Sequence, residues 1–398
     1  MRSIRHLGAA LAASLLLLAC GGGSDDGPRV PGPSGAPTAS AAFTSVISFG
    51  DSLSDLGTYT PATSVTGNGA PPYIGGRFTT NSTTNRIWVQ LVAASLGLAV
   101  TPAEVGFNAL SQPCPAAAGG PAAAATCTGY GQGGSRVTIP RGIGQNPDGS
   151  GALTVPVVTQ VANHLARKGD FTATDLVFVF GGNNDILIQF QTFAARAGAI
   201  AAQAAGGLIT PAQAQVLTLE ALVDADNAVK LAAQQLATVI RTDILGNGAR
   251  YVAVLNLPNA AAAPLGASLP SASARNALSG LVTTFNDTLR TGLDRQPVAW
   301  VDFGAFFGGV IANPAGAGFA NASVPACDAA KISAITGGLV TDGTSLFCNA
   351  DALPYNGIRV GADENTWLFA DAVHPTTGGH AAIGSFINAE LDRLGWVD

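Results

Sequence analysis

The chain reads FTSVISFGDSLSD from Phe43 to Asp55. The apolar run at the start of this stretch predicts a buried β-strand, and Gly50 begins a turn. Ser52 would then lie at the carboxyl edge of a sheet, where open α/β sheets bind their ligands. A serine hydroxyl becomes a useful nucleophile only when a base takes its proton and a third group orients that base. The rest of the chain must therefore supply a histidine, an acid and hydrogen-bond donors.

Helix-like and strand-like segments alternate after this strand. Helices are expected over Asn85–Gly97, Val155–Lys168, Ala272–Leu293 and Thr377–Leu394, with two more between Leu187 and Leu245 that break near Gly206 and Pro211. Strands are expected over Leu176–Phe180, Tyr251–Leu255 and Val298–Phe303. Residues 102–150 are rich in glycine, alanine and proline and are expected to be irregular. This alternation predicts an α/β fold, a single three-layer α/β/α domain with a mostly parallel central sheet, over residues 43–398.

The composition limits the classes of partner. The 398 residues are 47% hydrophobic and 11% charged, which is enough for a large core, and the formal net charge is −6. Loss of Arg2 and Arg5 with a signal peptide leaves 17 basic against 25 acidic residues, or −8. An acidic chain with few lysines lacks the basic surface that phosphate backbones require, so no nucleic-acid partner is expected.

The N-terminus has the features of an export signal. Arg2 and Arg5 precede the apolar run Leu7–Leu18, which is too short to span a bilayer comfortably. The run leads into LLAC, which ends at Cys20 and resembles a bacterial lipobox. That resemblance implies cleavage before Cys20 and a lipid on this cysteine, so residues 1–19 are expected to be a lipoprotein signal peptide. An ordinary secretory signal with an incidental cysteine is the alternative.

Residues 20–42 are expected to be the lipidated cysteine and a disordered linker, because they are rich in Gly, Ser, Pro and Asp. A lipid on such a tether would hold a soluble domain at a membrane. Gly21 stands where an aspartate typically retains lipoproteins in the inner membrane. In a Gram-negative source we therefore expect the protein at the outer membrane or cell surface of the envelope, with secretion as the alternative.

Four further cysteines suggest disulfides in an exported chain, with three ways of pairing them. The short spacings favour Cys114 with Cys127 and Cys327 with Cys348. Each bridge would close a short loop and contribute about 3 kcal/mol. A zinc site is the alternative, although it would lack a Cys-x-x-Cys pair and a nearby histidine.

Two segments offer hydrogen-bond donors. Residues 129–136 read GYGQGGSR, which also spells the Gly-x-Gly-x-x-Gly of a dinucleotide site. That motif needs a preceding strand and a following helix, whereas a cysteine loop and VTIP flank this one, so a turn that offers backbone N–H groups to an anion is favoured. Residues 181–185 read GGNND after the strand that ends at Phe180. An asparagine amide there can donate to a developing oxyanion or, as the alternative, cap the following helix.

One of the four histidines has the surroundings of a general base. His374 lies in DAVHP, three residues after Asp371. This spacing can bring the carboxylate to Nδ1 and leave Nε2 free for a serine, although a purely structural pair is the alternative. His6 falls in the signal, His164 is expected on the surface, and His380 lies in the closing helix with no acid nearby in sequence.

In chain order these four segments resemble the blocks of the GDSL, or SGNH, esterase and lipase family: Gly-Asp-Ser-Leu, a glycine block, Gly-x-Asn-Asp and Asp-x-x-His-Pro. The resemblance extends from about Phe43 to the C-terminus and takes in NRIWV at residues 85–89 and NLP at residues 256–258. It implies the flavodoxin-like fold of SGNH hydrolases. It also implies hydrolysis of carboxylic esters with no metal and no cofactor.

The resemblance further implies a role for each site residue. The nucleophile, the base and its orienting acid would be Ser52, His374 and Asp371, and the oxyanion hole would consist of Asn184 and the backbone N–H groups of Gly134 and Ser52. The glycine block of the family usually begins with asparagine, where this chain has Gly129. Gly133 therefore stays an alternative to Gly134.

The expected activity is that of an esterase or lipase that forms an acyl-enzyme and acts, as a monomer, on a small-molecule or lipid ester. A phospholipase or acyltransferase on membrane lipids and a carbohydrate deacetylase are alternatives that use the same residues. A catalytically silent binding lipoprotein of the envelope is the alternative from a different class. The loops that would shape the substrate pockets, residues 102–150 and 187–245, give no signal for the acyl chain or the alcohol.

Overall fold

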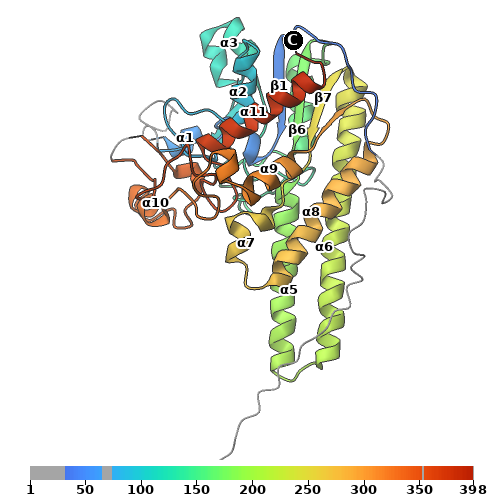
Figure 1. Cartoon of the computed structure of the whole chain (residues 1–398), viewed down its shortest axis with the longest axis vertical. Helices are drawn as coiled ribbons and strands as arrows, with labels where there is room; N and C mark the ends of the chain where they lie inside the picture. The colour runs from blue at the N-terminus through green and yellow to red at the C-terminus, as the bar shows by residue number, and fades with distance from the viewer. Residues whose placement is uncertain (1–31, 65–73, 352–353, 398) are drawn as a thin grey trace, which may run out of the picture. The chain divides into compact units, whose positions relative to one another are not determined.

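The computed structural model describes residues 32–64, 74–351 and 354–397. A central sheet has the strand order β2-β5-β1-β6-β7-β8 (Figure 1). The strands are β1 (Ser45–Gly50), β2 (Thr101–Pro102), β5 (Cys127–Gly129), β6 (Asp175–Phe180), β7 (Tyr251–Leu255) and β8 (Ala299–Val301). Every neighbouring pair is parallel, which confirms the predicted α/β class.

Helices alternate with these strands along the chain. They are α1 (Thr60–Thr63), α2 (Trp88–Ser95), α3 (Pro121–Ala125), α4 (Val157–Lys168), α5 (Asn183–Ala205), α6 (Pro211–Val239), α7 (Pro264–Ser268), α8 (Ala272–Gly292), α9 (Phe303–Ala312), α10 (Ala329–Ile335) and α11 (Thr377–Arg393). The longer ones agree with the predicted ranges to within a few residues. The main difference is α5, which begins at Asn183 and not at the predicted Leu187.

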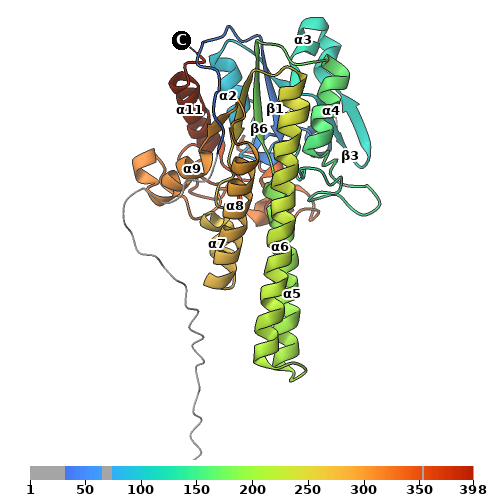
Figure 2. The same cartoon turned by 90° about the vertical axis from the view of Figure 1, so that its right-hand side faces the viewer.

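The sheet lies between two layers of helices (Figure 2). On one face, Trp88 of α2 packs edge-on against Phe178 of β6, and α11 packs on α2. On the other face, His164 of α4 packs edge-on against Phe49 of β1. Phe178 is paired with Ser48, the neighbour of Phe49, so the two phenylalanines point to opposite faces of the sheet. The three-layer α/β/α arrangement is thereby confirmed.

Residues 102–150 are more regular than predicted. β3 (Glu104–Phe107) and β4 (Leu110–Pro113) form an antiparallel pair, and β5 joins the main sheet directly before the glycine block. Strands of two to four residues are too short for a recognisable period, so pairing with neighbours defines them. The glycine block therefore does follow a strand, but the next helix is α4 at Val157, and the dinucleotide motif remains incomplete.

The packed part of the chain begins before residue 43. Nε1 of Trp396 donates to the carbonyl of Pro37 at 2.6 Å, and the hydroxyl of Tyr251 donates to the carbonyl of Ala39 at 3.0 Å. Part of the predicted linker thus lies against the domain, because its backbone carbonyls are partners for these aromatic side chains. The predicted signal peptide and Cys20 lie outside the described residues. No helix within the described ranges is long and apolar enough to cross a membrane.

α5 and α6 form a long helical pair that extends beyond the sheet (Figures 1 and 2). Because α5 directly follows β6, the asparagines at its start lie at the carboxyl edge of the sheet, as does Ser52 after β1.

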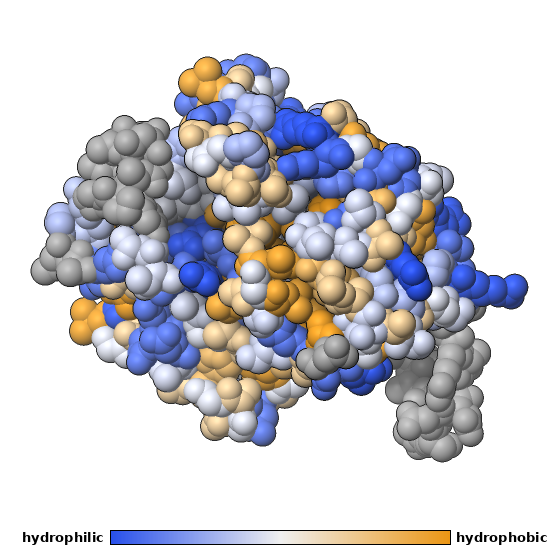
Figure 3. Space-filling model, turned by 90° about the horizontal axis from the view of Figure 1, so that it is seen from above, coloured by the Kyte–Doolittle hydropathy of each residue, from blue (hydrophilic) through white to orange (hydrophobic). Residues whose placement is uncertain are grey.

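On the face of the molecule seen in Figure 3, apolar side chains gather near the middle, between scattered hydrophilic groups.

Candidate active site

Ser52 lies just past the carboxyl end of β1, as predicted. Gly50 closes the strand with φ at +155°, and a Cβ there would lie 2.0 Å from the carbonyl oxygen of Phe180 in β6, so glycine is required. Asp51 then caps the short 3-10 helix that starts at Ser52 by accepting the N–H of Leu53 at 3.3 Å. The side chain of Ser52 is thus held on a fixed turn at the edge of the sheet.

His374 and Asp371 lie beside this serine. Nε2 of His374 is 2.9 Å from Oγ of Ser52, and Nδ1 is 2.8 Å from each carboxylate oxygen of Asp371. An ionised carboxylate can only accept, so Nδ1 carries the ring proton and Nε2 accepts the serine hydroxyl. The fold therefore brings Ser52 next to Asp371 and His374, although Ser52 and His374 are 322 positions apart in sequence.

Asp371 is held in its ionised form. Burial opposes its charge, but the charge of His374 and hydrogen bonds from His374, Ser345 and Val373 outweigh burial and keep the pKa of Asp371 below its ordinary value. The backbone N–H groups of Val373 and His374 donate to Oδ1 at 3.0 and 2.9 Å, and that of Ser345 donates to Oδ2 at 2.8 Å. A carboxylate that stays ionised fixes the tautomer of the imidazole.

The predicted oxyanion donors Ser52, Gly134 and Asn184 line one cavity. The backbone N–H groups of Ser52 and Gly134 have no acceptor among the described residues. Gly133, by contrast, donates its N–H to Oδ2 of buried Asp55 at 2.8 Å. Gly134 is therefore the one of the two glycines whose N–H is left for a ligand.

The amide of Asn184 is oriented by the glycine block. The side chain is buried in the first turn of α5, and its Nδ2 donates to the carbonyl of Ser135 at 2.9 Å. An amide nitrogen carries two protons, so one remains for a second acceptor. The alternative role as a helix cap is not seen, because the N-cap residue Gly182 precedes both asparagines and no side-chain cap bond is made.

A buried ion pair that sequence reasoning missed joins the glycine block to α5. Nε of Arg136 lies 2.9 Å from Oδ1 of Asp185, and the backbone N–H of Val137 donates to Oδ2 at 2.9 Å. Burial raises the pKa of Asp185, while the charge of Arg136 opposes that shift. Since Gly134 precedes Arg136 by two residues and Asn184 directly precedes Asp185, this pair sets the distance between two candidate oxyanion donors.

A second missed contact ties α5 to the serine turn. Nδ2 of Asn183 donates to Oδ2 of the fully buried Asp51 at 3.0 Å. Burial raises the pKa of Asp51 to about 6, although hydrogen bonds from Asn183 and Leu53 and the charge of His374 oppose this shift. The two adjacent asparagines of the GGNND segment therefore have separate partners.

The cavity at Ser52 has a volume of about 370 Å³ and is mainly apolar. Because β1 lies inside the sheet, lining residues come from both of its sides. Those from the β5 side and the loops near it are Tyr59, Phe78, Phe107, Gly133, Gly134 and Ile143, and those from the β7 side are Ile186, Leu187, Pro258, Val282, Phe307 and Ile311. Asp342 is the one carboxylate among the described lining residues, which include no lysine or arginine.

The four cysteines of the described region form the pairs that the spacings favour, Cys114 with Cys127 and Cys327 with Cys348. A sulfur atom in a disulfide is not available as a thiolate ligand, so the alternative of a zinc site is wrong.

His164 is buried and does not lie on the surface as predicted. Its ring stacks on Phe171 with centroids 4.5 Å apart. It follows Val157 and Val161 at helical spacing, and this periodicity is a better guide than the basic residues beside it in sequence. Burial lowers the pKa of His164 to about 4 and that of His380, which is also buried, to about 3.

Comparison with protein-family models matches residues 46–387 to the GDSL-like lipase/acylhydrolase family. A comparison with curated proteins found no similar sequence. The matched residues include the Ser52 turn, the glycine block, the start of α5 and the loop with Asp371 and His374. The chain therefore belongs to the GDSL-like lipase/acylhydrolase family and is a hydrolase of ester bonds.

Proposed function

We propose that this chain hydrolyses a carboxylic ester through an acyl-enzyme on Ser52. His374 accepts the hydroxyl proton as Oγ attacks the ester carbonyl, and Asp371 stabilises the imidazolium that forms. The bond to the alcohol oxygen then breaks, and the alcohol leaves with the proton from His374. A water molecule then gives a proton to His374 and attacks the acyl-enzyme, and the acid leaves as Ser52 recovers its proton. The observation that carries this proposal is the contact of 2.9 Å between Nε2 of His374 and Oγ of Ser52.

The oxyanion of the tetrahedral intermediate would accept hydrogen bonds from the backbone N–H groups of Ser52 and Gly134 and from the amide of Asn184. Support comes from the two unused backbone donors and from the fixed orientation of the amide. Removing one such donor typically lowers the rate by about 10²–10³.

The cavity lining favours a neutral ester with apolar groups on both sides of the carbonyl. A phosphate headgroup is normally held by arginine or lysine, and a sugar by several polar side chains. The described lining has no arginine or lysine, and its one carboxylate, Asp342, would repel a phosphate. It does contain polar side chains besides the candidate catalytic ones, namely Tyr59, Asn183, Asn259 and Thr344, but most of its surface is apolar. We therefore favour an esterase or lipase over a phospholipase and over a carbohydrate deacetylase.

An acyltransferase is the second candidate, because an apolar alcohol that occupies the cavity could replace water as the acceptor. Incubation with an ester and a sterol or long-chain alcohol separates the two activities. A new ester in excess of free acid would favour transfer, and free acid alone would favour hydrolysis.

The variant Ser52→Ala tests the nucleophile. We expect turnover of a short aryl ester to fall by about 10⁴-fold or more, with unchanged circular dichroism and melting temperature. Ser54→Ala is the matched control, because Ser54 lies in the same turn and its buried hydroxyl has no partner among the described residues. Undiminished turnover in Ser52→Ala would overturn the proposal and would revive a binding role.

We further infer a lipid on Cys20. The LLAC sequence supports it, and the two disulfides fit an exported protein. Mass spectrometry of the mature protein from a bacterial host should give an N-terminal peptide that begins at Cys20 and carries a diacylglyceryl mass. A mature N-terminus elsewhere, without added lipid, would contradict this inference.

A further inference from the structure

Among the described residues, one donor from outside the loop of Asp371 bonds to its carboxylate. The backbone N–H of Ser345 donates to Oδ2 at 2.8 Å. The other donors, Val373 and His374, belong to the loop that carries Asp371. Within the part of the chain that the structure describes, Ser345 is therefore the one donor that ties this carboxylate to another segment.

The Ser345 segment is a short turn next to a disulfide. Residues Ser345–Phe347 form a 3-10 helix, and Cys348, which follows it, is bonded to Cys327. A three-residue 3-10 helix has few and poorly aligned internal hydrogen bonds. The position of the Ser345 N–H must therefore be fixed by other parts of the molecule.

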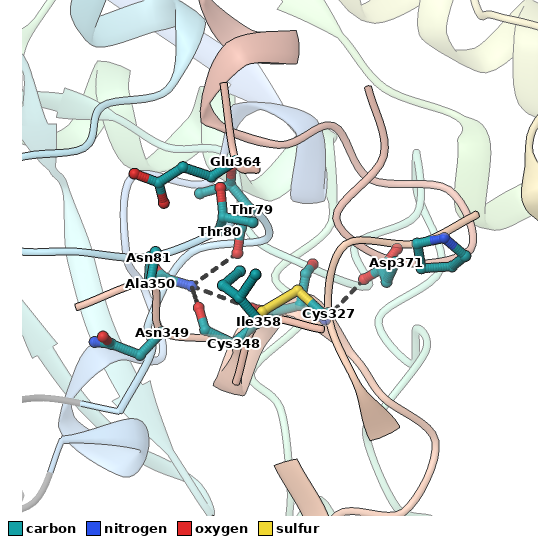
Figure 4. The surroundings of a disulfide bond; sticks show 12 residues. Thr79, Thr80, Asn81, Cys327, Cys348, Asn349, Ala350, Ile358, Glu364 and Asp371 are labelled. Carbon is teal, nitrogen blue, oxygen red and sulfur yellow. Dashed lines mark hydrogen bonds between the residues drawn. A yellow bond between two sulfur atoms is a disulfide. The ribbon is translucent and has the colours of Figure 1, made fainter. Parts of the chain in front are cut away.

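Asn81 makes several of the contacts that fix it. The side chain is fully buried, and its Nδ2 lies 3.1 Å from the carbonyl oxygen of Ser345 and 3.2 Å from that of Cys348. The same Nδ2 lies 2.8 and 3.0 Å from the carbonyl oxygens of Arg77 and Thr79 in its own segment, so its two protons are shared between the two segments. Its backbone N–H donates to the carbonyl of Cys348 at 2.8 Å, and its own carbonyl accepts from Ala350 at 2.6 Å. Figure 4 shows Asn81 and the Cys327–Cys348 bridge close together, with Asp371 beyond them. One asparagine thus joins two segments that are 264 residues apart in sequence.

We propose that Asn81 and the Cys327–Cys348 disulfide position Asp371 for catalysis, by holding the N–H of Ser345 on its carboxylate. This inference rests on the proposed role of Asp371 as the group that orients His374. Asn81 does not line the cavity at Ser52, so it is a positioning residue that acts through the turn. Without its amide, the carbonyls of Ser345 and Cys348 each keep one backbone donor but lose the side-chain donor that links them to Asn81, so the turn relaxes and Ser345 moves away from Asp371.

The test is the variant Asn81→Ala, measured well below its melting temperature with a short aryl ester. A misplacement of about 1 Å at a catalytic group can cost about 10²-fold, so we expect kcat to fall by about 10- to 100-fold. KM is expected to rise by less than the fall in kcat: Thr344 and Leu346 of the same turn line the cavity, whereas Asp371 acts on the chemical step. Asn81→Asp keeps the shape of the side chain but replaces the donating Nδ2 by a carboxylate oxygen at neutral pH. This variant should show the same loss of kcat.

Asn256→Ala is the matched control. Asn256 is also buried and joins two segments, through Asp302 at 2.7 Å and the N–H of Gly304 at 2.7 Å, and its side chain makes no hydrogen bond to the Ser345 turn among the described residues. It should lower the melting temperature and leave kcat unchanged. An Asn81→Ala variant with the same behaviour would show a merely structural role and overturn the proposal.

A second measurement covers the case in which Asn81→Ala does not fold. Replacement of both Cys327 and Cys348 by alanine, with Asn81 unchanged, should lower kcat by about 10- to 100-fold. When Asn81→Ala folds, the combined variant should lose no more than either variant alone, because both act through one contact. Unchanged kcat without the disulfide, or losses that multiply in the combined variant, would contradict the proposal. Failure of the proposed function itself would appear elsewhere, as undiminished turnover in Ser52→Ala.

Discussion

The two asparagines after β6 are adjacent in sequence and differ in their partners. Asn183 donates to the carboxylate of Asp51, whereas Asn184 donates to the carbonyl of Ser135 in the glycine block. Both line the cavity. We assign the oxyanion to Asn184, whose amide lies against the block that contains Gly134, and we assign the support of the serine turn to Asn183.

These assignments predict unequal losses of activity. Asn184→Ala should lower kcat by about 10²–10³, because it removes a donor to the developing charge. Asn183→Ala should lower kcat by less than about tenfold, because Ser52 keeps the cap from Asp51. Steady-state kinetics on one aryl ester compares the two variants, and the reverse order of losses would exchange their roles.

Residues that act through short motifs could be predicted from the sequence, and residues that act through backbone contacts could not. Ser52 and His374 are in segments whose own sequence indicates their chemistry. Asp55 holds the N–H of Gly133, which is 78 positions away, and Asn81 holds the carbonyl of Cys348, which is 267 positions away. No local pattern signals such a contact, because any carboxylate or amide can accept from or donate to any backbone group.

At the scale of elements, the central strands were predictable and the start of α5 was not. β7 has the predicted range, and β6 begins one residue earlier than predicted, at Asp175. Every residue of both strands is buried, as the apolar runs Leu176–Phe180 and Tyr251–Leu255 indicate. The GGNND segment reads as a turn, yet α5 begins inside it. Gly182 takes φ +118° there, with the ring of Phe285 from α8 where a side chain would be, so a tertiary contact defines this helix start.

The ion pair between the glycine block and α5 yields a stability prediction. Arg136→Met should lower the free energy of unfolding by about 3–5 kcal/mol, because it leaves the buried carboxylate of Asp185 without its partner. Urea unfolding at pH 7 measures this change. Arg196→Met is the matched control, since its pair with Asp224 is exposed and should be worth less than about 1 kcal/mol. Equal losses in both variants would contradict the prediction.

At the scale of the whole molecule, buried histidines make folding sensitive to acid. Free histidine binds a proton near pH 6.5, whereas burial lowers the pKa of His164 in the folded chain to about 4. Between these values the unfolded state binds more protons, so this histidine favours unfolding as the pH falls from 6.5 to 4. Asp51 acts in the opposite sense over part of this range, because its pKa is raised to about 6.

The variant His164→Phe isolates this effect, because the contribution of Asp51 cancels in the comparison with the wild type. Phenylalanine can keep the stacking contact with Phe171 and does not titrate. Relative to the wild type, the variant should gain about 2 kcal/mol between pH 7 and pH 5. Urea unfolding at both pH values gives the difference, and a gain that does not depend on pH would show that His164 does not titrate as described.

The nucleophile is the central claim, and a fluorophosphonate tests it most directly. Such a reagent reacts with a serine whose proton is taken by a neighbouring base and whose product is held by oxyanion donors. Peptide mass mapping after inactivation should locate a single adduct on Ser52, with loss of ester turnover in proportion to labelling. Full turnover with Ser52 unlabelled, or inactivation with the adduct on another residue, would contradict the account.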